Sequence, residues 1–236
     1  MSGETLSERT AVIIPALNEA GNIHHLVQEV LATRPVQVIV IDNGSTDATA
    51  QEAASAGAQV VREPRRGYGY ACAAGVAAAD ADVLAFLDGD KSFLPSELPR
   101  IIVPILSGQA EMVLGSRVLG YIAPDAMPPQ QRFGNWLAAR LMRLLYGIQA
   151  TDLGPYRAIR RDLLISLDMR EMTYGWPTEM MVKAARRKMR ILEVPVSFHT
   201  RRSGRSKVSG TLRGTVLAAW FILGVTLRYA WEKKPD

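Results

Sequence analysis

The feature that most constrains the fold of this chain is an apolar run at residues 36–41. Its sequence, VQVIVI, is apolar at nearly every position instead of alternating with polar residues. Such a run is typical of a strand that is buried on both faces of a parallel sheet. A similar run, VLAFL, occupies residues 83–87. The two runs therefore predict central strands of one sheet.

Short segments with strand and helix patterns alternate through the first half of the chain. Their βαβαβαβ order predicts an α/β fold with a doubly wound, mostly parallel central sheet flanked by helices. Ligands bind outside the carboxyl ends of the strands in such sheets, so the loops after the strands are expected to carry the function. The expected strands are residues 11–14, 36–41, 58–61 and 83–87, and the expected helices are residues 22–31, 46–56 (with a cap at Ser45 or Thr46) and 70–79.

The second half of the chain has no internal repeat and no linker that would separate two domains. We therefore expect one domain over residues 1–210 and an amphipathic, apolar C-terminal helix within residues 211–236. The longest apolar stretch, residues 216–227, is shorter than the roughly 20 residues of a membrane-spanning helix, so a transmembrane helix is not expected. Because residues 1–10 are polar, a signal peptide is not expected there. Further helices are expected at residues 97–106, 133–146 and 178–187, and further strands at residues 112–114 and 191–196.

The net charge of +5 is divided unevenly along the chain. Residues 1–130 contain 8 basic and 15 acidic side chains, a balance of −7, whereas residues 131–236 contain 20 basic and 8 acidic side chains, a balance of +12. This polarity indicates an anionic partner for the second half, such as phosphate groups, nucleic acid or lipid headgroups, or else a solvated basic face. Nucleic acid is disfavoured because no aromatic-rich binding motif accompanies the charge.

Carboxylates are the candidate metal ligands of this sequence. Cys72 is the only cysteine and there are three histidines, which excludes a disulfide framework and argues against a zinc cluster. Asp88-Gly89-Asp90 directly follows the expected strand at residues 83–87. Two carboxylates one residue apart can chelate a hard divalent cation that keeps open positions for phosphate oxygens. A surface turn also explains the motif, but its place at a strand end favours the metal site.

Two other loops at strand ends carry polar side chains. Asp42 follows the strand at residues 36–41 and can accept hydrogen bonds from a base or a ribose, whereas Asp47 is assigned to capping the next helix. Residues 15–19 form the third loop. All three loops are expected to meet at one rim of the sheet.

Several motifs, in their order and spacing, resemble the family 2 glycosyltransferases of the GT-A fold. These motifs are VIIPALNEAGNI, VIDNGSTDAT, RGYGYACAAG, VLAFLDGD and LGSR. The downstream TDLGPYRAIRR, YGWPTEMMVKAARR and EVPVSFHTRRSGRSKVSG are similar to the polyprenyl-phosphate sugar transferase branch, the relatives of dolichyl-phosphate mannose synthase. The resemblance covers roughly residues 10–215.

The resemblance implies a Rossmann-like GT-A domain that moves a sugar, with inversion, from a UDP- or GDP-linked sugar to a polyprenyl phosphate. It implies Mg²⁺ or Mn²⁺ on Asp88 and Asp90, with Asp90 and Asp152 as catalytic residues. The family often has Gln or another polar oxygen where this chain has Ser92, so the preceding Lys91 is an alternative direct partner for a phosphate. The residues implied for the nucleotide sugar are Pro15, Ala16, Asn18, Glu19, Asp42, Arg66, Gly67, Asp88, Gly89 and Glu179.

The resemblance also places basic and polar residues at the acceptor phosphate. Arg side chains can bind a phosphate through two hydrogen bonds, and the Gly- and Ser-rich backbone of residues 199–210 would let that loop close over it. Asp152 would act as a general base or orient the acceptor. The alternative is that Asp152 is a turn residue that caps the next helix. Glu179 would approach the donor sugar, and the alternative is a glutamate in the first turn of a helix, where the helix dipole favours it. The implied acceptor residues are Arg117, Arg132, Asn135, Arg201, Arg202, Arg205 and Lys207.

The helix expected at residues 212–229 is more apolar than a solvated terminal helix. Trp220, Tyr229 and Trp231 suit an interface between apolar and wet surroundings. Two explanations stay open: the helix packs on the domain or on a second subunit of a homodimer, or it lies in a membrane interface. A lipid-linked acceptor favours a peripheral enzyme at the cytoplasmic face of the membrane. A soluble hydroxyl acceptor and a catalytically silent nucleotide-sugar-binding protein stay as alternatives.

Overall fold

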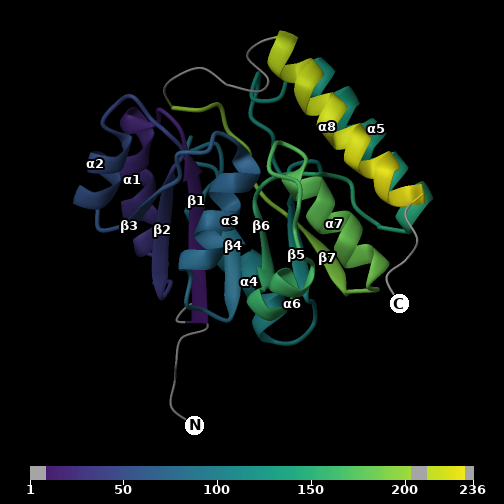
Figure 1. Ribbon diagram of the computed structural model, residues 1–236, viewed down its shortest axis with the longest axis horizontal. Helices are drawn as coiled ribbons and strands as arrows, with labels where there is room; N and C mark the ends of the chain where they lie inside the picture. The colour runs from purple at the N-terminus through teal and green to yellow at the C-terminus, as the bar shows by residue number, and fades with distance from the viewer. Residues whose placement is uncertain (1–8, 203–211, 232–236) are drawn as a thin grey trace.

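A computed structural model of the chain describes residues 9–202 and 212–231. Within them, one central sheet has the strand order β3-β2-β1-β4-β6-β5-β7, and helices cover both of its faces (Figure 1). The strands are β1 (Thr10–Ala16), β2 (Gln37–Asp42), β3 (Gln59–Arg62), β4 (Val83–Phe86), β5 (Met112–Ser116), β6 (Arg157–Arg160) and β7 (Ile191–Pro195). The helices are α1 (Ala20–Leu31), α2 (Thr49–Ser55), α3 (Tyr68–Ala78), η2 (Pro95–Glu97), α4 (Leu98–Leu106), α5 (Pro129–Tyr146), α6 (Arg161–Ser166), α7 (Trp176–Arg186) and α8 (Leu212–Trp231).

The sheet is mostly parallel, as the sequence predicted. Only β6, among the described strands, runs antiparallel to its neighbours β4 and β5. Strand β2 is buried on both faces: Val38 and Val40 belong to an apolar cluster with residues of α1 and α4, whereas Ile39 and Ile41 belong to the cluster on the other face, with residues of α3 and α7. The continuous apolar run therefore reflects two hydrophobic cores, one on each face of the sheet.

One expectation about the elements is wrong, and two elements were not expected. Helix α2 begins at Thr49 rather than at residue 46, because the preceding residues form a turn in which Asp42 Oδ1 accepts the Ser45 N–H at 2.8 Å and Asn18 Oδ1 accepts the Thr46 N–H at 2.8 Å. Strand β6 and helix α6 were not anticipated. The sequence of β6, RAIR, is short and has Arg at both ends, yet Arg157 at its start is buried.

Helices α5 and α8 lie side by side and form an outer layer over α7 (Figure 1). The side of α5 that faces inward consists of Asn135 and small or flexible apolar residues, whereas Phe133, Trp136 and Leu144 are more than half exposed. The larger apolar residues of α5 therefore lie mostly on its outward side. Within the described part of the chain, none of the helices combines the length and the hydropathy that a membrane span requires.

Candidate active site

A cleft of about 660 Å³ opens at the carboxyl ends of the strands, where the sequence predicted the site. Loops after β1, β2, β4 and β5 form its polar walls, and Phe221 and Ile222 of α8 also line it. Among the lining residues are ten that the resemblance implied: Pro15, Ala16, Glu19, Arg66, Gly67, Asp88, Gly89, Asp90, Arg117 and Arg201.

Asp90 lies in the cleft with both carboxylate oxygens bonded to the protein. Ser92 donates to Oδ1 through its backbone N–H at 3.0 Å and through its hydroxyl at 2.6 Å. Arg201 donates to Oδ2 through Nη2 at 2.6 Å and through Nε at 3.2 Å. The same Nη2 is 3.5 Å from Glu19 Oε1, so one guanidinium joins carboxylates from the loops after β1 and β4.

Asp88 lies deeper, against the start of α3. The Tyr68 hydroxyl is 3.4 Å from Asp88 Oδ1. Burial, reinforced by the nearby charge of Asp90, raises the pKa of Asp88 to about 7. A positive charge placed between the two carboxylates would lower this pKa again, because it favours the ionised form of both groups. The pair is therefore suited to a cation.

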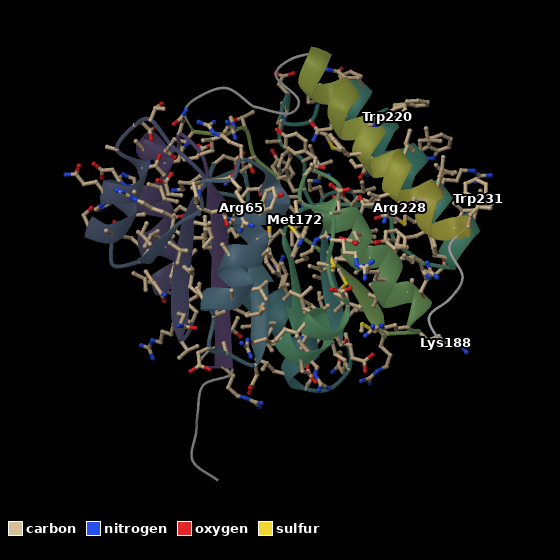
Figure 2. The ribbon with its side chains drawn as sticks, in the orientation of Figure 1. Arg65, Met172, Lys188, Trp220, Arg228 and Trp231 are labelled. Carbon is tan, nitrogen blue, oxygen red and sulfur yellow. The ribbon has the colours of Figure 1, made fainter. Side chains whose placement is uncertain are left out.

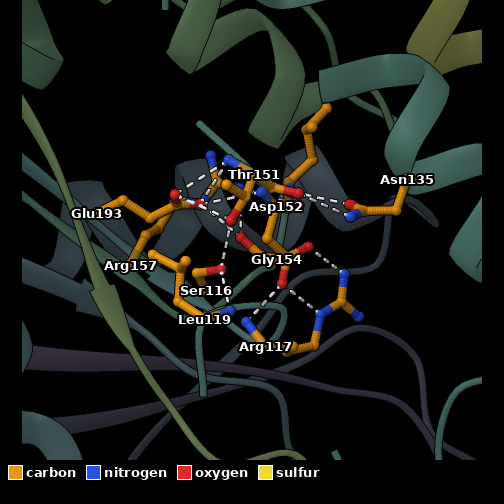
Figure 3. Close-up of polar contacts among 10 residues, drawn as sticks. Ser116, Arg117, Leu119, Asn135, Thr151, Asp152, Gly154, Arg157 and Glu193 are labelled. Carbon is orange, nitrogen blue, oxygen red and sulfur yellow. Dashed lines mark hydrogen bonds and ion pairs between the residues drawn. The ribbon is translucent and has the colours of Figure 1, made fainter. Parts of the chain in front are cut away.

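Asp152 is fully buried and is paired with Arg117 (Figure 3). Its Oδ2 accepts the backbone N–H and the Nε–H of Arg117, each at 2.7 Å, and its Oδ1 accepts Nη2 at 2.6 Å. These bonds use two of the three guanidinium nitrogens, and Nη1 has no hydrogen-bond partner in the described part of the chain. Asp152 therefore orients Arg117, which lines the cleft, and does not itself reach the cleft.

The turn that carries Asp152 is held from two further sides. Glu193 of β7 accepts the backbone N–H groups of Thr151 and Asp152. Asn135 of α5 donates to the Thr151 carbonyl at 3.1 Å and accepts the Leu153 N–H at 3.0 Å (Figure 3). Asn135, expected at the acceptor phosphate, is thus buried and uses its amide to fix this turn.

The loops at the end of β2 form a second tightly bonded group. Asn43 donates to the carbonyls of Glu63 and Arg65 and accepts the Gly67 N–H at 2.9 Å. Gly67 has a φ of +151°, and a Cβ there would lie 2.4 Å from the Met172 carbonyl oxygen, so only glycine fits. Asn18 and Asp42 were both expected at the nucleotide. Their side-chain oxygens accept backbone N–H groups of the turn at residues 44–46, and neither residue lines the cleft.

Glu179 has a different position from the one expected. Its carboxylate is fully buried, accepts the backbone N–H groups of Arg170 and Glu171, and is paired with Lys183 at 2.8 Å. The hydroxyl of Tyr229 from α8 donates to Oε1 at 2.5 Å. Glu179 therefore ties α8 to the loop before α7 instead of touching the cleft.

Residues 11–167 match the model of a family described as Glycosyl transferase family 2. The chain belongs to this family. It is therefore a glycosyltransferase, and the architecture described above is the GT-A fold.

The family includes relatives that cover nearly the whole chain. The glycosyltransferase is 37% identical over 220 residues to an uncharacterized glycosyltransferase of Mycobacterium tuberculosis, covering 92% of this chain and 96% of the relative. It is 30% identical over 238 residues to the undecaprenyl-phosphate mannosyltransferase of Micrococcus luteus, covering 95% and 96%. It is 31% identical over 245 residues to the polyprenol monophosphomannose synthase of Mycolicibacterium smegmatis, covering 92% and 89%.

A solved structure shares the fold over the full chain. It is the glucosyl-3-phosphoglycerate synthase of Mycobacterium tuberculosis in complex with Mn²⁺, UDP and phosphoglyceric acid. The TM-score is 0.77 at 23% identity, covering 100% of this chain and 85% of that one.

Several basic residues of the glycosyltransferase lie apart from the places expected for them. Lys91 extends to α1, where its Nζ is 2.5 Å from Glu29 Oε1, so the alternative in which it binds a phosphate is not supported. Arg132 donates to the Met127 carbonyl and Arg202 is exposed, and neither lines the cleft. Arg205 and Lys207 lie outside the described residues.

Two residues that line the cleft, Ser92 and His199, and one buried beside it, Arg157, were not singled out as functional from the sequence. Arg157 is fully buried, donates to the Pro177 carbonyl at 2.7 Å and to the Gly154 carbonyl, and has its pKa lowered by burial to about 10. Ser92 fixes Asp90. The buried Nε2 of His199 has no hydrogen-bond partner in the part of the chain that the structure describes, and His199 lines the cleft. Each of the three residues lies in or beside a motif that the sequence analysis quoted. Sequence alone did not identify their roles, because most of these roles depend on residues far away in the chain.

Proposed function

We propose that this glycosyltransferase moves a sugar from a nucleoside diphosphate sugar to a polyprenyl phosphate, in a reaction that depends on Mg²⁺ or Mn²⁺ and inverts the anomeric centre. The observation that carries the proposal is the composition of the cleft. Carboxylates gather on the loops after β1 and β4, Arg117 stands after β5, and the apolar side chains of Leu153, Phe221 and Ile222 complete the lining. Such a cleft suits a cation with a diphosphate, an acceptor phosphate and a hydrocarbon chain.

The residues of the donor side fit a divalent cation. Asp88 and Asp90 offer hard carboxylate oxygens, and the orphaned Nε2 of His199 is a further nitrogen without a partner in the described residues. A bound cation would neutralise charge that develops on the diphosphate leaving group. The Mn²⁺ and UDP of the solved glucosyl-3-phosphoglycerate synthase agree with this assignment at the level of the shared fold.

The acceptor side supports binding of a phosphate without a general base. The phosphate oxygen of a polyprenyl phosphate is already ionised near neutral pH, so it needs orientation rather than deprotonation. Asp152 holds the Nε and Nη2 edge of Arg117 through two parallel bonds, which leaves Nη1 for an anion. The acceptor oxygen would then attack the anomeric carbon from the face opposite the diphosphate.

The outer layer supports a peripheral contact with an anionic membrane. The exposed apolar residues of α5 and α8, which we call the aromatic face, are Phe133, Trp136, Leu144, Leu145, Trp220, Leu227 and Trp231. Trp220 and Trp231 project from the outer side of α8, and Arg228 lies between them along the helix (Figure 2). The two helices contain five Arg and no Asp or Glu in their sequences. Aromatic and leucine side chains beside arginines suit a headgroup region.

A soluble phosphorylated acceptor is the second candidate. It is favoured by the solved synthase of the same fold, whose structure contains phosphoglyceric acid. Arg117 would bind either acceptor through its phosphate, so the apolar part of the cleft distinguishes them. Phe221, Ile222 and Leu153 would have no partner on a small polar acid.

The test is a panel of UDP- and GDP-linked sugars with Mg²⁺ or Mn²⁺, read as release of the nucleoside diphosphate and as labelled glycolipid. Each donor is paired with a short polyprenyl phosphate and, separately, with 3-phosphoglycerate. We expect turnover with the polyprenyl phosphate and its loss in Ile222→Asp, whereas the matched exposed variant Ile165→Asp on α6 retains it. Turnover with 3-phosphoglycerate alone would overturn the acceptor assignment.

A further inference from the structure

Arg201 reaches the centre of the cleft from a segment far away in the sequence. It follows β7, yet its guanidinium bonds to Asp90 of the loop after β4 and approaches Glu19 of the loop after β1. The side chain is 22% exposed, so it lies within the cleft and not on the outer surface. Arg201 therefore closes a bridge across the two loops that would hold a donor.

The bridge uses the oxygen that a cation would need. Ser92 already occupies Asp90 Oδ1 with two hydrogen bonds, and Arg201 occupies Oδ2 with two more. A divalent cation on Oδ2 would stand within contact distance of the guanidinium, and two positive charges at that separation repel each other. The cation and Arg201 thus compete for one atom.

Charge balance explains why an arginine fits this place. Glu19, Asp88 and Asp90 bring three carboxyl groups to the cleft, and their negative charges raise the pKa of Arg201 although burial opposes this. A guanidinium neutralises such a cluster and satisfies its oxygens. A cation bound with a diphosphate would supply the same positive charge together with new anionic oxygens beside it.

We propose that Arg201 is an internal counter-cation that the divalent cation must displace from Asp90, after which its guanidinium pairs with the diphosphate. The proposal rests on the cation site of the proposed function, but not on the identity of the acceptor. It assigns Arg201 two opposite effects. Arg201 weakens binding of the cation alone, and it strengthens binding of the nucleotide once the cation is in place.

The first measurement is titration of Mn²⁺ into the full chain without nucleotide, with free Mn²⁺ followed by electron paramagnetic resonance. Arg201→Gln should bind Mn²⁺ roughly tenfold more tightly than the wild type, because a charge-assisted pair no longer has to be broken. Arg201→Lys, which keeps the charge but not the two parallel bonds, should fall between them. Unchanged or weaker binding of Mn²⁺ by Arg201→Gln would overturn the proposal.

The second measurement is calorimetric titration of UDP and of GDP at saturating Mn²⁺. Arg201→Gln should bind the nucleotide that the wild type prefers several-fold more weakly, since the displaced guanidinium is no longer there to pair with phosphate. Equal affinity in both proteins would show that Arg201 plays no part after displacement and would contradict the second half of the proposal.

Two variants remove the same charge elsewhere. Arg202→Gln changes the exposed neighbour, and Arg190→Gln changes an exposed residue just before β7, at the amino end of that strand and outside the lining of the cleft. Both variants should bind Mn²⁺ with the affinity of the wild type. If Arg202→Gln gained as much Mn²⁺ affinity as Arg201→Gln, the cause would be the loss of a positive charge in general and not direct competition for Asp90. These titrations contain no acceptor, so a failure of the polyprenyl phosphate assignment would leave their outcome unchanged.

Discussion

Among single side chains, the carboxylates near the site fall into two groups according to whether they line the cleft. Asp152 and Glu179 have every oxygen committed to backbone N–H groups or to a neighbouring cation of the protein. Asp88 and Asp90 instead line the cleft, and the pKa of Asp88 is raised by burial and by its neighbour. Carboxylates enclosed by the protein hold structure in place, whereas two neighbouring carboxylates that line a cleft are suited to binding a cation.

The first prediction at this scale concerns Asp90. Asp90→Asn should lower donor affinity and turnover together, by roughly two orders of magnitude or more, because it removes a charge that binds the cation. The fold should stay intact, since Asp90 lies at a strand end and outside both cores. Kinetics and thermal unfolding measure the two effects. Asp82→Asn, an exposed residue paired with Arg9, serves as the control, and full activity in excess chelator would contradict the assignment.

The second prediction distinguishes a positioning role of Asp152 from a general base. Asp152→Asn should raise the KM for the acceptor and lower thermal stability, at a cost of about 3 kcal/mol, because the buried Arg117 loses its counter-charge. The dependence of the rate on pH should keep its shape. Disappearance of an acid limb from that profile would show that Asp152 accepts a proton. Asp162→Asn, which breaks an exposed pair with Arg160, should change neither property.

The helices and strands differ in how much of their position the sequence dictates. The central strands carry continuous apolar runs, and those runs predicted their places to within two residues. The start of α2 was missed because side chains from another loop stabilise the turn before it, and no local pattern encodes a partner such as Asn18. Strand β6 was missed because its burial depends on pairing with both β4 and β5.

The prediction at this scale concerns how α8 is attached to α7. Burial by itself raises the pKa of Glu179, but its bonds from Lys183, Tyr229 and the backbone outweigh this and hold the pKa below its ordinary value. A carboxyl whose folded-state pKa is lowered stabilises the fold above its unfolded-state pKa of about 4.3 and loses this contribution as the pH falls through the lower folded-state value. The melting temperature of the wild type should therefore fall more steeply than that of Glu179→Gln between about pH 5 and pH 3.

A second variant tests the same attachment at neutral pH. Tyr229→Phe removes one hydrogen bond to Glu179 and should cost about 1 kcal/mol of stability, with faster hydrogen exchange in α8. Parallel curves for the wild type and Glu179→Gln, together with unchanged exchange in Tyr229→Phe, would mean that packing and the bonds from Arg186 and Tyr146 to backbone carbonyls of α8 attach this helix.

For the whole molecule, the aromatic face of α5 and α8 predicts binding to anionic vesicles. In flotation experiments the wild type should bind vesicles that contain anionic lipid, and the binding should weaken with salt, because arginines and apolar side chains both contribute. Trp220→Ala with Trp231→Ala should weaken the partition by roughly tenfold or more. Ile165→Ala, another exposed apolar residue, should have no effect.

A negative result in the flotation experiment has a specific meaning. If the intact protein did not bind vesicles and sedimented as a dimer, the aromatic face would be an interface between two copies of the chain. Sedimentation velocity of the wild type and of the Trp220→Ala, Trp231→Ala variant separates these outcomes. If the aromatic face is a dimer interface, the wild type sediments as a dimer and the variant as a monomer.

The sequence by itself determined the α/β architecture, the strand ends that carry the site, and the family. These properties follow from local patterns: the period of apolar residues reports which faces are buried, and a motif that follows a strand must lie at one edge of the sheet. Only the tertiary structure decided the roles of individual residues in the site. Arg117, Asp152 and Arg201 derive their roles from partners 35 to 111 positions away. Side-chain burial and pairing are properties of the folded surroundings, so residues of the same type can bind a ligand or support the fold.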